Sequence, residues 1–402
     1  MESTEDINTS QFIAHLSGAV SWPGHCYWGK LAVMRAAKAA GMRMRRPLVI
    51  TDRAAWNAGA TVVTQALAAT SNNEFQVFDG VVPNPSLAQV RAALQLARKF
   101  QCQSIVAVGG GSVIDVAKVV YGCLCSGLEP DELATVRGQA WLEGAVSADD
   151  LLLLAIPTTA GTGSESSSAA LIQGEDGRKH LYRSLRTRPA FVALQPELTL
   201  SLPFGATAQG GFDAALHALG AWVNTDPSPI GKAIALHALR VCMRALPAAL
   251  DNPDSLSARS DMQMGAYLAG VAIGICKVDA VHAMCTPLES RVKKPHAEVL
   301  APLFRVVSRY TIQTDAQAYA DAARQLGFGN TRDDHQAALS LIEKIEQLAS
   351  HAHISLHFED LSLSEQDGNL LAHQALKSAS MPLNPRVLTH RQISSLYLQM
   401  VA

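Results

Sequence analysis

Residues 104–118 read SIVAVGGGSVIDVAK, and this stretch decides the fold. The short apolar segment SIVAV has the character of a buried strand, and it runs directly into three glycines that open a helical segment. Because glycine has no Cβ atom, backbone N–H groups at such a turn can approach a phosphate at the positive end of the helix. The stretch therefore predicts a strand, a turn and a helix that bind a diphosphate-bearing cofactor. GGGS is not G-x-G-x-x-G, so a turn without a ligand is the alternative.

The same alternation of strand and helix continues on both sides of this stretch. Further short apolar strands are expected in the segments RPLVITD, NEFQVFDGV, LLLLAIPTT and PAFVALQP. Between two of them, residues 86–100 have a helical period, with one apolar face made by Leu87, Val90, Ala93, Leu94 and Ala97. Short strands separated by crossover helices predict an α/β fold with a parallel sheet that is covered on both faces.

The second half of the chain has a different texture. After Pro203 the strand signals stop, and long segments rich in alanine and leucine follow. A chain of 402 residues also exceeds what one hydrophobic core usually supports. We therefore expect two domains, an α/β dinucleotide-binding domain over residues 1–202 and an all-helical domain over residues 203–402.

Composition narrows the class of protein. Hydrophobic residues make up 48% and charged residues 17%, which predicts a globular chain with large cores. The net charge of −2 gives no reason to expect nucleic acid or an acidic membrane as partner, so a small-molecule ligand fits better. The polar start lacks a secretory signal, and the longest apolar run is broken by Pro157. Seven scattered cysteines suit a reducing compartment, with Cys123 and Cys125 as core thiols, and we expect a cytoplasmic protein without a membrane span.

Two other predicted strands end in polar residues suited to a cofactor. The strand LLLLAIP is followed by TTAGTGSE, and ligands of open α/β sheets bind at the carboxyl ends of strands. The strand PLVIT is followed by Asp52, whose carboxylate can accept hydrogen bonds from an adenosine ribose and would repel a 2′-phosphate. This favours NAD over NADP, although Arg53 leaves NADP as an alternative. Asp52 could instead only cap the next helix.

The helical half opens with a candidate metal site. In GGFDAALHALGAW, Asp213 and His217 stand four residues apart and so share one helical face. With His282 and His296 farther on, one oxygen and three nitrogen donors suit Fe(II) or Zn(II). Taken singly, these histidines could be hydrogen-bonded core residues. A second histidine cluster, HAHISLH at residues 351–357, lies in a polar segment and is interpreted as surface.

These residues together resemble the iron-containing, or group III, alcohol dehydrogenases. The segments GGGSVIDVAK, IPTTAGTGSE, GFDAALHALGAW, VHAM, the PH of KKPHAEVLAP and NPRVLT match the motifs of that family in order, over nearly the whole chain. The resemblance implies a Rossmann-like domain and a helical domain, with NAD(P) and one divalent metal, Fe2+ or Zn2+, meeting in the cleft between them. It implies that the metal ligands are Asp213, His217, His282 and His296.

The resemblance also implies a set of cofactor-binding residues. By similarity, the pyrophosphate lies on the glycine turn, the threonines line the cofactor site, and Asn84 lies near the adenosine ribose. These residues are Gly109, Gly110, Gly111, Ser112, Thr158, Thr159, Thr162 and Asn84.

The chain departs from the family pattern at a few positions. Thr286 stands where the family usually has a second histidine near the substrate, and Glu289 with Ser290 replace two glycines. A threonine hydroxyl can pass a proton through water, but it cannot act as a base near neutral pH. Gln195 replaces a common aspartate, and the sequence offers no physical account of that change.

We therefore expect a metal-dependent, NAD(P)H-linked enzyme that reduces an aldehyde to an alcohol, and we expect a homodimer. The alternatives are a maleylacetate-reductase-like enzyme, suggested by PHAE at residues 295–298, a lyase of the dehydroquinate-synthase kind, and a homologue that binds ligand without catalysis. The motifs GFDAALHALGAW and NPRVLT argue against the lyase.

The basic loop between His282 and His296 suggests a more specific substrate. Arg291, with Lys293 and Lys294, could bind an aldehyde that carries an anionic group, such as a carboxylate semialdehyde, phosphonoacetaldehyde or sulfoacetaldehyde. A solvated basic loop is the alternative.

Overall fold

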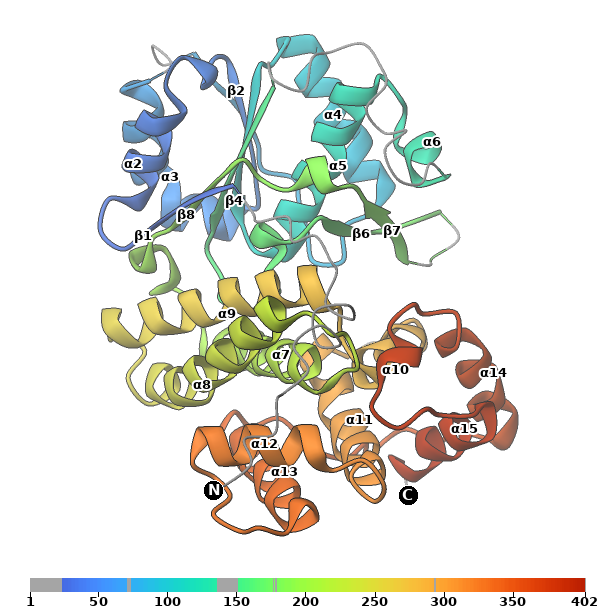
Figure 1. Cartoon of the computed structure of the whole chain (residues 1–402). Helices are drawn as coiled ribbons and strands as arrows, with labels where there is room; N and C mark the ends of the chain where they lie inside the picture. The colour runs from blue at the N-terminus through green and yellow to red at the C-terminus, as the bar shows by residue number, and fades with distance from the viewer. Residues whose placement is uncertain are drawn as a thin grey trace, which may run out of the picture.

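The chain folds into an α/β half followed by a helical half (Figure 1). The structure is a computed structural model, and it describes residues 24–70, 74–135, 151–175, 177, 179–292 and 294–401. The last described strand ends at Leu194, and the helical half begins with helix α7 at Phe204. The predicted fold class, a parallel α/β sheet followed by helices, is confirmed.

Six strands form one parallel sheet in the order β1-β8-β5-β4-β2-β3. Their bounds are β1 His25–Trp28, β2 Pro47–Thr51, β3 Gln76–Phe78, β4 Ser104–Gly109, β5 Leu152–Pro157 and β8 Phe191–Leu194. Strands β4 and β5 are neighbours, and Gly109 pairs with Pro157 at their carboxyl ends. This register places the glycine turn beside the TTAGTGSE segment, where a ligand of an open α/β sheet binds.

Helices cover both faces of the sheet (Figure 1). Their bounds are α2 Ala32–Ala40, α3 Arg53–Ala68, α4 Leu87–Phe100, α5 Gly111–Ser126 and α6 Pro130–Thr135. Helices α2 and α3 share one core with the sheet, and α4 and α5 share the other. All five predicted apolar positions of α4 are buried, and Ser86 with Gln89 forms a capping box at its start. Cys123 and Cys125 of α5 are buried free thiols, as expected, and burial raises the pKa of Cys123 to about 12.

Strand β1 and an antiparallel hairpin of strands β6 and β7 were not predicted. The hairpin strands are β6 Ala169–Gln173 and β7 Lys179–Arg183. Strand β7, KHLYR, is half polar, so it lacks the apolar run that marks the sheet strands. The hairpin follows the TTAGTGSE segment and lies at the edge of the α/β half that faces the helices (Figure 1).

The helical half holds the largest core of the molecule. Its helices are α7 Phe204–Val223, α8 Pro229–Asp251, α9 Leu256–Cys276, α10 Ala280–Glu289, α11 His296–Thr311, α12 Gln317–Leu326, α13 Asp334–His351, α14 Glu365–Ala375 and α15 His390–Gln399. Helix α8 is long and apolar enough to cross a membrane, and α9 with α10 would pass the same test as one bent pair. However, α8 packs against both α7 and α9, and 56% of its apolar window is buried, as in a core helix.

Candidate active site

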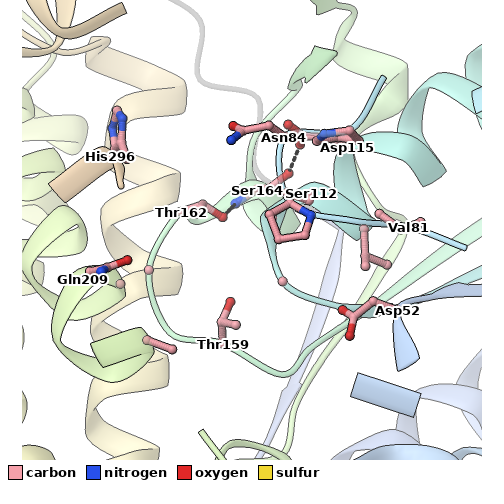
Figure 2. A pocket seen from close by; sticks show the side chains of 18 of the residues that line it. Asp52, Val81, Asn84, Ser112, Asp115, Thr159, Thr162, Ser164, Gln209 and His296 are labelled. Carbon is pink, nitrogen blue, oxygen red and sulfur yellow. Dashed lines mark hydrogen bonds between the residues drawn. The ribbon is translucent and has the colours of Figure 1, made fainter. Parts of the chain in front are cut away.

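A cavity of about 1180 Å³ lies between the two halves. One wall is formed by the carboxyl ends of β2, β4 and β5 with the start of α5, and the other by α7, α10 and the start of α11. Figure 2 shows Asp52, Ser112 and Thr159 on the α/β side, opposite Gln209 and His296 on the helical side. The cavity therefore joins the predicted cofactor residues to the predicted metal residues.

The glycine turn packs closely against the loop that follows β5. A Cβ atom on Gly111 would lie 2.7 Å from Thr162 Oγ1, and one on Gly110 would lie 3.1 Å from the Thr159 side chain. Gly110, Gly111 and Thr162 line the cavity, so the start of α5 opens directly into it. Gly109 is not among the residues that line the cavity, and a Cβ atom on it would lie 2.5 Å from a methyl group of Val113. The glycines let the loop pack close to the start of α5, and the cavity in front of this helix N-terminus suits a diphosphate.

Other predicted cofactor residues lie around this cradle. Ser112, Thr158 and Thr159 line the cavity on its α/β side. Asn84 also lines it, from a backbone conformation with φ of 55°. Asp52 lines the cavity and also accepts a hydrogen bond of 2.9 Å from the Ala55 N–H, so it caps α3. Both interpretations of Asp52 are therefore compatible with its position.

A buried polar network holds the loop after β5, and the sequence analysis did not include it. Ser164 donates to Asp115 Oδ1 at 2.6 Å, and Lys118 Nζ donates to Ser164 Oγ at 2.9 Å (Figure 2 shows the first bond). The Thr162 hydroxyl accepts from the Ser164 N–H at 3.2 Å. Lys118 is fully buried, and burial lowers its pKa to about 8. The signal was present, because Asp115 and Lys118 stand three residues apart on α5 and so share a face.

Two pairs of glycines join the same loop to the helical half. A Cβ atom on Gly161 would lie 2.6 Å from the Cα atom of Gly210 in α7. A Cβ atom on Gly163 would lie 2.4 Å from the Cα atom of Gly270 in α9. Only residues without side chains allow such backbone contacts. The loop therefore touches the helix that carries Asp213 and also its neighbour α9.

Four side chains from three helices converge at the helical end of the cavity. Asp213 and His217 come from α7, His282 from α10, and His296 is the first residue of α11. The Nε2 atoms of the three histidines lie 3.5 to 3.6 Å from one oxygen, Oδ1 of Asp213. The rings of His217 and His282 stack with their centres 4.5 Å apart. Thus the structure brings all four predicted ligands together.

These spacings fit a shared metal ion better than hydrogen bonds. An N···O distance of 3.5 to 3.6 Å is too long for a good hydrogen bond. Ligand atoms placed about 2.1 Å from a tetrahedral ion would be about 3.4 Å apart. The donor set of one carboxylate and three imidazoles also suits Fe(II) or Zn(II). The residues present therefore fit a divalent metal.

The charge states of Asp213 and His217 suit metal binding, whereas neighbouring groups raise the pKa values of His282 and His296 against the effect of burial, so these two rings would release a proton on binding a metal. Burial would raise the pKa of Asp213, but the neighbouring His296 and His282 hold it well below its usual value. Burial lowers the pKa of His217 to about 3, so its ring is neutral near neutral pH. Metals bind the ionised carboxylate and the neutral imidazole, so neither group needs to lose a proton first.

The third histidine has a partner on its outer nitrogen. His296 Nδ1 lies 2.7 Å from Oε1 of Glu289, and the other carboxylate oxygen accepts from Lys179 Nζ at 3.1 Å. Cys285 Sγ lies 3.6 Å from the same nitrogen. Glu289 and Lys179 line the cavity, and so does Thr286, the threonine in place of the family's histidine. In the sequence, Glu289 stands out only as a departure from the family pattern, and no local pattern marks Lys179.

The structure does not bring Arg291 to the cavity, which corrects the expectation for this residue. Arg291 lies just beyond the end of α10, and its guanidinium pairs with Asp367 Oδ1 at 2.6 Å. Glu289, at the end of α10, thus faces the cavity, while Arg291, two residues later, reaches α14. Lys293 lies outside the described residues, whereas Lys294 lines the cavity beside His296.

Two further positions have a structural account. His351 is exposed and pairs with Asp251 at 2.8 Å, and His353 and His357 are also exposed, in line with a surface segment. Gln195 is buried, and its Oε1 accepts a hydrogen bond of 3.2 Å from the Val33 N–H in the first turn of α2. Its side chain thus satisfies a free donor at a helix N-terminus.

Comparisons with known proteins agree with this geometry. Residues 23–196 match the family model for iron-containing alcohol dehydrogenase, and residues 207–401 match the model for the C-terminal part of the Fe-containing alcohol dehydrogenase family. The chain is 32% identical to alcohol dehydrogenase 4 of Schizosaccharomyces pombe over 93% of this chain and 87% of that protein. It is 31% identical to 1,3-propanediol dehydrogenase of Klebsiella pneumoniae, over 88% and 91% of the two chains.

A solved structure shows the same arrangement of the whole chain. The sulfoacetaldehyde reductase of Bifidobacterium kashiwanohense, solved in complex with NAD+, superposes with a TM-score of 0.83 at 26% identity, over 96% of this chain and 99% of that one. Matching family models cover most of both halves, and the predicted ligands meet in one cluster. The chain belongs to the iron-containing alcohol dehydrogenase family.

Proposed function

We propose that this oxidoreductase interconverts an aldehyde and an alcohol with NAD(H) as the hydride carrier and one divalent metal, Fe2+ or Zn2+. The observation that carries the proposal is the shared cavity. One end has a helix N-terminus with no side chain on Gly110 or Gly111, and the other has three imidazoles around Asp213. Diphosphate recognition and metal binding in one cavity suit metal-assisted hydride transfer.

The residues of the chain divide the task between them. When bound, the metal would polarise the substrate oxygen and the nicotinamide would exchange a hydride with the carbon. The N-terminus of α5 would orient the diphosphate, and Asp213 would contribute the one negative charge of the ligand set. Thr286 lines the cavity and is exposed, so its hydroxyl can pass a proton between the substrate oxygen and water.

A small anionic aldehyde is the more specific substrate that we propose. Lys294 lines the cavity beside His296, although its ammonium group rests 5.6 Å from the centre of the Phe358 ring, which does not line the cavity, so this flexible side chain would turn to bind an anion. Lys179 is engaged by Glu289, so Lys294 takes the role that the sequence analysis gave to Arg291. Similarity to a sulfoacetaldehyde reductase supports the same substrate class.

The test is an NADH oxidation assay on the purified chain with added Fe2+ or Zn2+. The panel contains neutral aldehydes, anionic aldehydes of similar length, and maleylacetate. We expect turnover of aldehydes, and His282→Ala should lose both the metal and the activity because one of four ligands is gone. His351→Ala, a histidine on the surface, is the control and should keep both. Full metal content in His282→Ala by elemental analysis would contradict the ligand assignment.

The substrate class has its own arm in the same assay. Lys294→Met should raise the KM for the anionic aldehyde by about 10-fold, or about 1.4 kcal/mol, and leave that for the neutral aldehyde nearly unchanged. Arg291→Met is the matched control and should change neither value, since Arg291 pairs with Asp367. Preference of the unmutated enzyme for neutral aldehydes would exclude the anionic class. If maleylacetate were the one compound of the panel that is turned over, the chain would be assigned as a maleylacetate-reductase-like enzyme.

A further inference from the structure

Among the three histidines of the cluster, His296 differs in how its ring is held. The side chains of His217 and His282 are 11% and 8% exposed, so the core around them fixes their orientation. The side chain of His296 is 38% exposed, and it stands at the very start of α11. Packing alone therefore constrains this ring least.

Glu289 supplies the constraint that packing does not. It is the last residue of α10, its side chain is only 10% exposed, and its Oε1 lies 2.7 Å from His296 Nδ1. A carboxylate at this distance accepts the proton of Nδ1, which leaves the Nε2 lone pair facing Asp213. For comparison, Asp279 lies 3.9 Å from Nδ1 of His282, beyond hydrogen-bond distance.

Glu289 is itself held from the other half of the molecule. Its Oε2 accepts from Lys179 Nζ at 3.1 Å, and Lys179 is the first residue of strand β7 in the α/β half. The Lys179 side chain is 26% exposed, so this ion pair is partly shielded from water, and it is less screened than a surface pair. The chain of contacts runs from Lys179 through Glu289 to His296.

We propose that Glu289 is a positioning residue that orients His296 for the metal, and that Lys179 reaches the metal site from the α/β half through Glu289. The proposal rests on the proposed metal site and extends it to residues outside the ligand set. Carboxylates that accept from the outer nitrogen of a metal-bound histidine fix its tautomer and ring angle, and their loss typically weakens metal binding by about 10- to 100-fold. The same loss is expected here.

The test measures metal affinity directly, by competition for Zn2+ with a chelating dye and by the visible spectrum of the Co2+-loaded protein. Glu289→Ala should weaken Zn2+ binding about 10- to 100-fold and change the Co2+ spectrum. Glu289→Gln keeps an oxygen that can accept from Nδ1, so it should lose less. Lys179→Met should give an intermediate loss that disappears in the Glu289→Ala background, since Lys179 acts only through Glu289.

Arg291→Ala is the matched control for these variants. It removes a charge two residues from Glu289, but its partner is Asp367 and not a residue of the cavity, so Zn2+ affinity should not change. Thermal unfolding of the metal-free variants should stay close to that of the unmutated chain, which separates orientation of His296 from loss of the fold. If Glu289→Ala does not fold, Glu289→Gln still tests the proposal. Weaker Zn2+ binding by Glu289→Gln, with unfolding like that of the unmutated chain, would support it.

Two results would overturn the proposal. One is Zn2+ affinity in both Glu289 variants equal to that of the unmutated chain. The other is a second bound ion per chain that is lost in Cys285→Ala, because Cys285, Glu289 and His296 would then form a metal site of their own. Failure of the proposed function would look different: the unmutated chain would bind one ion, respond to Glu289→Ala, and yet turn over no aldehyde.

Discussion

Asp52 combines two tasks that one substitution can separate. Its carboxylate caps α3 through the Ala55 N–H and also lines the cavity where we place the adenosine ribose. Asparagine caps helices about as well as aspartate does, but it has no charge. The residue can therefore lose its negative charge without losing its structural task.

Cofactor preference should follow that charge. We expect the unmutated enzyme to prefer NADH, because a carboxylate beside the 2′-phosphate of NADPH is repulsive. Asp52→Asn should narrow the gap in kcat/KM between NADH and NADPH at unchanged stability. Asp52→Ala should narrow it too but also lower the free energy of unfolding by about 1 kcal/mol through loss of the cap.

An opposite result would assign the preference elsewhere. If the unmutated enzyme has a higher kcat/KM with NADPH, then Arg53, which lines the cavity and lies 3.9 Å from Asp79, outweighs Asp52.

At the scale of single elements, the closest backbone contact between α9 and the cofactor loop is made by Gly270. A Cβ atom on Gly270 would lie 2.3 Å from Ser166 Oγ and 2.5 Å from the Gly163 carbonyl oxygen. Gly274, one turn later on the same helix, would place its Cβ atom no closer than 3.4 Å to the Arg188 side chain. Both glycines lie inside α9, but Gly270 is buried against the loop whereas Gly274 is only half-buried.

Alanine at these two positions should therefore have opposite effects. Gly270→Ala should push the loop away from α9, lower the free energy of unfolding by about 1–3 kcal/mol and raise the KM for NADH. Gly274→Ala should be neutral or stabilise by up to about 1 kcal/mol, since alanine favours a helix more than glycine does. Chemical denaturation and steady-state kinetics measure both. Equal unfolding free energies for the two variants would show that the loop does not depend on this contact.

Strong periodicity made some elements predictable, and its absence hid others. The apolar face of α4 and the strand that ends at Gly109 follow from local patterns, and the i, i+4 spacing placed Asp213 beside His217. Local patterns do not show which way a side chain points at a helix end. For that reason Arg291 was expected at the cavity, while Glu289 occupies it.

Contacts between distant elements were also beyond the sequence. Lys179 and Glu289 are 110 residues apart, and Lys179 lies on a polar strand that the sequence did not reveal. Likewise, the sequence alone does not explain Gln195, because the Val33 N–H that donates a hydrogen bond to its side chain lies on a distant element. Such partners depend on how whole elements pack against one another, and a short stretch of sequence does not show this.

At the scale of the whole molecule, a buried acid in the loop between the halves ties stability to pH. Glu165 is 4% exposed, and burial raises its pKa from 4.5 to about 7, although Lys118 acts in the opposite direction. Its folded-state pKa is above the unfolded value, so its contribution to stability is fully present below pH 4.5. That contribution is lost as the pH rises to about 7.

Without this acid, the free energy of unfolding should depend less on pH between pH 4.5 and pH 7. Relative to the unmutated chain, Glu165→Gln should gain free energy of unfolding between pH 4.5 and pH 7, on the order of 3 kcal/mol at most. Denaturant unfolding at pH 5 and pH 8 measures the difference, with the exposed Glu359→Gln as control. An identical gain at both pH values would show that Glu165 is ionised throughout.

The two glycine contacts, Gly161 with Gly210 and Gly163 with Gly270, are two points at which the backbones of the halves meet. Two fixed points define a line, so a rotation that preserves both contacts has a single axis, and the contacts are its pivots. In such a rotation, groups close to the line would move little, while groups farther from it would sweep longer arcs. A cleft that opens in this way widens for a substrate without separating the loop under the cofactor from the helix that carries Asp213.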